Sequence, residues 1–152
     1  MEAVVTSVIA VVGTLLGALV AGLLQYRLTR RERVAVQAAD LRRERLAAVT
    51  ALVAALAEHR RAMWVREDLR LNDADRAAYE QARATSHATR AAITAPLTAV
   101  KILVPALAEH AGTAARATYG LRHAADAAVL DARRTEAIEA ADRLVAAAAD
   151  AL

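Results

Sequence analysis

The side chains that most often carry chemistry in proteins are sparse in this sequence and form no recognisable site. The four histidines, His59, His87, His110 and His123, are never three or four residues apart, the spacing that places two ligands on one helix face. The segment ALAEH occurs twice, ending at His59 and at His110. Its adjacent Glu and His point about 100° apart on a helix and cannot face one metal ion together. We therefore predict no metal site and no cofactor.

Nucleophilic and phosphate-binding chemistry also lacks candidates. The chain has no cysteine, serine occurs only twice, and no glycine-rich phosphate loop or nucleophile elbow is present. The acidic pair Glu67 and Asp68 and the pair Asp73 and Asp75 border a predicted turn, and we interpret them as helix caps. No catalytic residue is assigned, and the sequence predicts a protein that is not an enzyme.

Positive charge is the feature with the clearest functional interpretation. The chain carries 20 basic and 17 acidic side chains, and Lys101 is its only lysine. This excess of arginine, like that of alanine, is typical of a high-GC, actinobacterial genome. The arginines that gather before residue 46 are Arg27, Arg30, Arg31, Arg33, Arg42, Arg43 and Arg45.

Three interpretations of this basic segment remain open. It can be a topology signal and a solvated helix face, with Glu32, Asp40 and Glu44 as intrahelical partners. It can bind anionic lipid headgroups beside a membrane, or it can bind DNA phosphates, for which no recognition motif is present. Trp64, the only tryptophan, either fills the core or contacts a partner.

A long apolar segment precedes these arginines. Residues 3–24 contain no charged side chain, and as a helix they would extend roughly 33 Å, enough to cross a hydrocarbon core about 30 Å thick. A soluble core helix would show periodic polar residues, and a signal peptide cleaved near Gly22 would carry basic residues at its start. Because the charge follows the segment, we expect a retained anchor in the inner membrane, with the N-terminus outside and the C-terminal domain cytoplasmic.

Small residues recur on one face of this segment. Gly13 and Gly17 have the GxxxG spacing, and Ala21 extends the face by one turn. Such a face lets two helices approach closely in a membrane, and we expect it to support a homo-oligomer, although short small-residue patterns also arise by chance.

The remainder of the sequence predicts helices and no strand. No Pro or Gly lies between Gln25 and Asn72, so one helix should run from the anchor into the domain, with an apolar stripe at Leu46, Val49, Val53, Leu56 and Met63. We place a left-handed residue at Asn72 and an N-cap at Asp73.

Three further helices should follow this turn. A second helix starts near Ala74 and is kinked or ended by Pro96, while Pro105 suits the first turn of the next, over residues 106–125. A last helix covers residues 131–149, with Ile138, Leu144 and Val145 on one face.

The predicted architecture is therefore all-α. A transmembrane anchor over residues 1–25 and a basic juxtamembrane helix over 26–45 lead into an antiparallel bundle of three to four helices over 46–152, with a break near 71–75.

The opening segments of the chain are similar to a known family. VVTSVIAVVGTLLGALVAGLLQYRLTRRER and LRRERLAAVTALVAALAEHRRA, covering about the first 60 residues, resemble the small membrane-anchored Kil-type plasmid-spread proteins of Streptomyces. The resemblance implies a role in the intermycelial spread of conjugative plasmids, at the cell membrane and with protein partners. It supplies no catalytic residues.

The leading hypothesis is thus a non-enzymatic single-pass membrane protein whose cytoplasmic helices mediate self-association or protein contacts. The alternative is a membrane-tethered basic module that binds DNA or anionic lipid. Nucleic acid is the less favoured partner because no aromatic residues are interleaved with the arginines.

Overall fold

The computed structural model describes the backbone of residues 2–152 and the side chains of Gln25 and of residues 33–152. The chain divides into two compact units, Met1–Leu41 and Arg42–Leu152. Among the residues described, no helix is both long enough and apolar enough to cross a membrane.

Several predicted features lie outside the described side chains. They include the anchor over residues 1–25, except for Gln25, which is exposed, and its face of Gly13, Gly17 and Ala21. Of the basic segment, Arg27, Arg30 and Arg31 also lie outside them.

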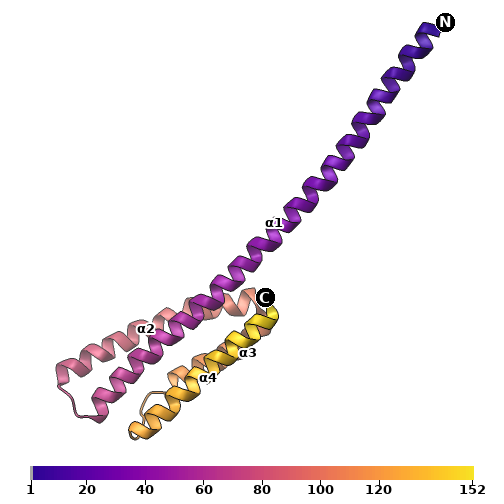
Figure 1. Ribbon diagram of the computed structural model, residues 1–152. Helices are drawn as coiled ribbons and strands as arrows, with labels where there is room; N and C mark the ends of the chain where they lie inside the picture. The colour runs from indigo at the N-terminus through magenta and orange to yellow at the C-terminus, as the bar shows by residue number, and fades with distance from the viewer. Residues whose placement is uncertain (1) are drawn as a thin grey trace. The chain divides into compact units, whose positions relative to one another are not determined.

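Apart from the connecting turns, the described backbone is helical, and it contains no strand, as the sequence predicts. Within the second unit the helices run alternately in opposite directions (Figure 1). The elements are α1 (Glu2–Leu71), α2 (Arg76–Leu103), the short 3-10 helix η1 (Pro105–Leu107), α3 (Ala108–Tyr119) and α4 (Ala127–Ala151).

The turn between α1 and α2 is longer by two residues than the capping pattern predicts. Asp73, not Asn72, takes the left-handed conformation with φ 47°, which a short polar side chain tolerates. The N-cap is Asp75, whose Oδ2 accepts the backbone N–H groups of Ala77 at 3.1 Å and Ala78 at 3.2 Å. The assignment of the cap to Asp73 is therefore wrong, because Asp73 still belongs to the turn, whereas the interpretation of Asp75 as a helix cap is confirmed.

The two prolines act differently. Pro96 does not end α2, which continues to Leu103. Because proline has no backbone N–H, the carbonyl of Ala92, four residues before Pro96, receives no hydrogen bond from it. Ala92 is exposed, so water can bind this carbonyl instead. Val104 leaves the helical region because a proline follows it, and Pro105 opens η1 as the sequence predicts.

The boundaries of the last two helices differ from the predicted ones. α3 ends at Tyr119 rather than near residue 125, with Gly120 as its C-cap. α4 begins at Ala127 rather than at Asp131, because the Oδ1 of Asp126 accepts the N–H of Val129 at 2.8 Å and caps the helix earlier.

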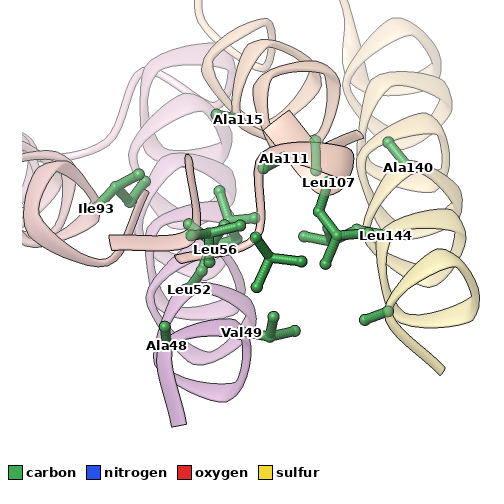
Figure 2. Packing of buried hydrophobic residues seen from close by; sticks show 14 residues of the cluster. Ala48, Val49, Leu52, Leu56, Ile93, Leu107, Ala111, Ala115, Ala140 and Leu144 are labelled. Carbon is green, nitrogen blue, oxygen red and sulfur yellow. The ribbon is translucent and has the colours of Figure 1, made fainter. Parts of the chain in front are cut away.

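The core is built from small side chains held close together. Figure 2 shows side chains of α1, η1, α3 and α4 meeting between the helices. Leu52 and Leu56 of α1, Ile93 of α2 and Leu144 of α4 are all fully buried. The main buried cluster comprises Ala48, Val49, Leu52, Leu56, Ile93, Val100, Val104, Leu107, Ala111, Ala114, Ala115, Ala140, Leu144 and Ala148.

Part of the predicted apolar pattern does not face this core. Leu46 is 57% exposed, and the fully buried Leu52 was absent from the predicted stripe. On α4 only Leu144 of the predicted face is buried, while Ile138 and Val145 are exposed. Small alanines take the inward positions of α4, so large side chains alone were a poor guide to its orientation.

This packing predicts different costs for two leucines of the same helix. Replacing the fully buried Leu52 with alanine leaves a cavity and should lower the free energy of unfolding by about 2–5 kcal/mol. Leu46→Ala, at an exposed position, should change it by less than about 0.5 kcal/mol. Urea denaturation followed by circular dichroism measures both values, and equal losses would contradict this core.

Candidate protein interaction surface

The histidines remain separate in the structure. His87, His110 and His123 are exposed and His59 is buried. Within the described part of the chain, no three His, Cys, Asp or Glu side chains are grouped so that they could hold a metal ion.

His59 is the only buried histidine among those described, and it lies between three helices. Its Nδ1 is 3.0 Å from the Oγ1 of Thr89 on α2, and its ring meets that of Tyr119 on α3 edge to face at a centroid distance of 5.7 Å. The guanidinium of Arg90 covers the Tyr119 ring at 3.9 Å. His59 therefore acts as a packing residue that joins α1 to α2 and α3.

Burial determines the charge state of this ring. Desolvation, followed by the nearby positive charges of Arg90 and Arg66, lowers the pKa of His59 to about 4. Its Nε2 is buried and has no hydrogen-bond partner among the described atoms. The imidazole is thus neutral at physiological pH.

A buried ionic group that the sequence did not predict lies near the C-terminal end of α1. Glu67 is fully buried, and its Oε2 accepts the Nε–H of Arg70 at 2.8 Å and the backbone N–H of His123 at 3.1 Å. Arg70 also donates to the carbonyl of Ala124. The interpretation of Glu67 as a helix cap is therefore wrong: it fixes the α3–α4 loop against α1.

The adjacent Arg66 extends this polar interior toward α2. Its Nη1 donates to the Oγ of Ser86 at 3.3 Å, and its Nη2 lies 3.5 Å from the hydroxyl of Tyr79. The Nε of Arg66 is 4.0 Å from the Oε1 of Glu67. Neither of these two atoms has a hydrogen-bond partner among the described residues, and both side chains are buried, so this group lies in the interior and not at an accessible site.

The described arginines of the basic segment are mostly at the surface. Arg33, Arg42 and Arg43 are exposed, whereas Arg45 is half-buried. Trp64 is also half-buried and packs against a second core cluster around Met63 and Leu130.

The indole of Trp64 has polar neighbours on α4. Its Nε1–H points to the Oδ1 of Asp131 at 3.4 Å, and the Arg134 guanidinium lies over its ring at 5.6 Å. Trp64 therefore fills part of the core, as one of its two predicted roles requires, and its contact with a partner stays a prediction.

An open apolar groove, which the sequence did not predict, lies between α1 and α4. We call it the α1–α4 groove; its volume is about 580 Å³. Leu46 and Val145 line it with 57% and 47% of their surfaces exposed, and small residues on both helices leave it open. The lining residues are Arg42, Leu46, Val49, Thr50, Val53, Ala54, Ala57, Val145, Ala148, Ala149 and Leu152.

A smaller pocket adjoins the groove at Ala57. It has a volume of about 300 Å³ and is lined by Ala57, Glu58, Arg60, Arg61, Trp64 and Arg134, and we call it the arginine pocket. Burial and, second, the positive charge of Arg134 lower the pKa of Arg60, whereas the negative charge of Asp142 raises it. Of the residues described, no carboxylate lies within 4.0 Å of these three guanidiniums.

The second unit is thus an alanine-rich antiparallel helical-bundle protein with an open apolar groove that ends in a cationic pocket. A sequence profile of the KilB plasmid transfer proteins matches residues 46–152. The protein named Protein KilB from Streptomyces lividans is 59% identical over 146 residues, which cover 95% of this chain and 96% of that protein. The chain belongs to the KilB plasmid transfer protein family.

These matches confirm the resemblance noted from the sequence and extend it. The profile covers the helical domain, including the alanine-rich part that carried no recognisable motif. No solved structure matches this chain.

The burial of His59 predicts a pH dependence of stability. The folded protein holds its pKa at about 4, below the ordinary 6.5, so the unfolded chain binds the proton more readily between these values. The contribution of His59 to the free energy of unfolding is fully present above pH 6.5. It falls by roughly 3 kcal/mol in total as the pH drops toward 4.

The measurement is the free energy of unfolding across this pH range for wild type, His59→Gln and His87→Gln. Because carboxylates also titrate there, the relevant quantity is the difference between profiles. His59→Gln should flatten the slope and the exposed His87→Gln should keep it; parallel profiles for all three proteins would refute the interpretation.

Proposed function

We propose that this chain acts in plasmid transfer as a non-enzymatic membrane protein whose helical domain mediates self-association or contacts with other proteins. Membership of the KilB plasmid transfer protein family carries the proposal. The α1–α4 groove supports the second part, because open apolar surface on a small domain is characteristic of protein contact sites.

The membrane part of the proposal rests on the sequence of residues 3–24. This segment is uncharged and is followed by Arg27, Arg30 and Arg31, which favour a cytoplasmic location for everything after it. The protein would cross the inner membrane once, with the bundle on the cytoplasmic side. Gly13, Gly17 and Ala21 would form the helix-pairing face.

Gly17→Leu tests the anchor and its pairing face together. A leucine side chain keeps the segment apolar but prevents close approach of two helices, so the protein should stay in the membrane fraction while crosslinked dimer falls several-fold. Gly22→Leu makes the same change off that face and serves as the control.

Recovery of the wild type in the soluble fraction would contradict the anchor. Equal crosslinking of Gly17→Leu and wild type would contradict the pairing face. The biological role is measured as plasmid spread between mycelia, in a strain that lacks the gene and in strains complemented with each variant. Undiminished plasmid spread in the deletion strain would contradict a function in transfer.

The second candidate function is binding of DNA or anionic lipid by the basic segment, for which the exposed Arg33 and Arg42 are the supporting observation. A salt titration separates the candidates. Contacts with phosphates weaken steeply as salt rises, whereas contacts made by apolar helix packing persist.

A further inference from the structure

We propose that the α1–α4 groove and the adjoining arginine pocket bind an amphipathic helix of another protein, apolar along one face and acidic near both ends. This inference rests on the proposed role in protein contacts and specifies the partner. It begins from the shape of the groove, which lies between two helices that run in opposite directions. Such a groove accepts a third helix lying along it.

The dimensions fit a helix of about five turns. Arg42 lies at one end of the groove and Arg61 in the arginine pocket at the other. These residues are roughly 28 Å apart along α1 at 1.5 Å per residue. The surface between them is almost entirely apolar, and exposed Leu46 and Val145 provide contacts for leucine-sized side chains.

The charges are placed at the ends of this surface. Arg42 marks one end, and Arg60, Arg61 and Arg134 surround the other. Three carboxylates are also near the pocket: Glu58 lines it, Asp131 lies beside Trp64, and Asp142 interacts with Arg60 at longer range. None of them is closer than 4.0 Å to the three pocket arginines in the described part of the chain. Their guanidiniums can therefore form ion pairs with a partner.

This charge pattern disfavours a second copy as the occupant. If two grooves paired in antiparallel fashion, Arg42 of one copy would face Arg61 of the other. If they paired in parallel, each arginine would face its own equivalent. Either arrangement opposes like charges, which costs binding energy, whereas an acidic helix satisfies both ends.

The apolar centre likewise disfavours nucleic acid. Binding to a phosphate backbone requires positive charge along the whole contact. The leucine and valine side chains of the groove would gain no apolar contact from phosphates. Helix-in-groove recognition instead lays the apolar face of a helix into an apolar groove, and Leu46, Val53 and Val145 supply apolar lining here.

A designed peptide tests the proposal without knowledge of the natural partner. The probe is a fluorescent helical 20-residue peptide (about five turns) with leucines along one face and glutamates in its first and last turns. A second peptide replaces each glutamate with lysine. Fluorescence anisotropy with the full chain in zwitterionic nanodiscs should show binding of the acidic peptide, at least about tenfold tighter than the lysine peptide.

Two matched substitutions locate the site. Ala54→Glu places a carboxylate inside the groove and should weaken the acidic peptide by about tenfold or more. Ala51→Glu makes the same change on the same helix at an exposed position outside the groove, and should alter affinity by less than about twofold. Glutamate is a good helix former, so both variants should keep the fold.

A charge exchange tests the orientation of the contacts. Arg61→Glu should weaken the acidic peptide and strengthen the lysine peptide, while Arg76→Glu, at the exposed start of α2, should do neither. Equal binding of both peptides, or equal effects of Ala54→Glu and Ala51→Glu, overturns the proposal. The proposal is also overturned if neither peptide binds and the wild type sediments as an oligomer that Ala54→Glu converts to a monomer. The occupant of the groove would then be a second copy.

The plasmid-spread assay separates this inference from the proposed function. A deletion that abolishes spread, combined with peptide binding unaffected by Ala54→Glu, overturns only the assignment of the groove. A deletion that leaves spread intact overturns the proposed function itself.

Discussion

The close approach of alanine-rich helix faces is the constraint on which this structure depends. Six of the fourteen residues of the main buried cluster are alanines, and the chain contains no phenylalanine. Each alanine buries little apolar surface, so stability requires many contacts at short interhelical distance. Leu52, Leu56, Leu107 and Leu144 supply the larger volumes at the positions where the helices converge.

The same shortage of bulky side chains explains the groove. Between α1 and α4 the lining includes Ala54, Ala57, Ala148 and Ala149, whose small side chains leave the space between the two helices unfilled. The bundle therefore combines a compact centre with an incompletely closed edge. Leu46 and Val145 are exposed at this edge.

The sequence predicted the helical fold well because its signals are local. The Pro105 helix start follows from backbone chemistry within a few residues, and the absence of strands from the backbone described, residues 2–152, follows from alanine and leucine content. Contacts between distant residues were beyond such reasoning. Nothing near Glu67 indicates that its partner is the N–H of His123, and only the packed bundle shows that Ile138 points outward.

The candidate surface was predictable only in fragments. Arg42 and Trp64 were singled out for their charge and size, but the α1–α4 groove required knowledge of which helices are neighbours. Val145, predicted to share one helix face with Ile138 and Leu144, lines this surface because alanines occupy the inward positions of α4.

The contact of Glu67 with the α3–α4 loop has a consequence for folding. Glu67 and His123 are 56 positions apart, so the carboxylate gains the backbone N–H of His123 only after both helical hairpins have formed and met, and until then only Arg70 of its own helix is at hand. Before that encounter, burying the ion is unfavourable and it stays hydrated. A half-assembled bundle is therefore penalised, and the two hairpins should fold as one cooperative unit.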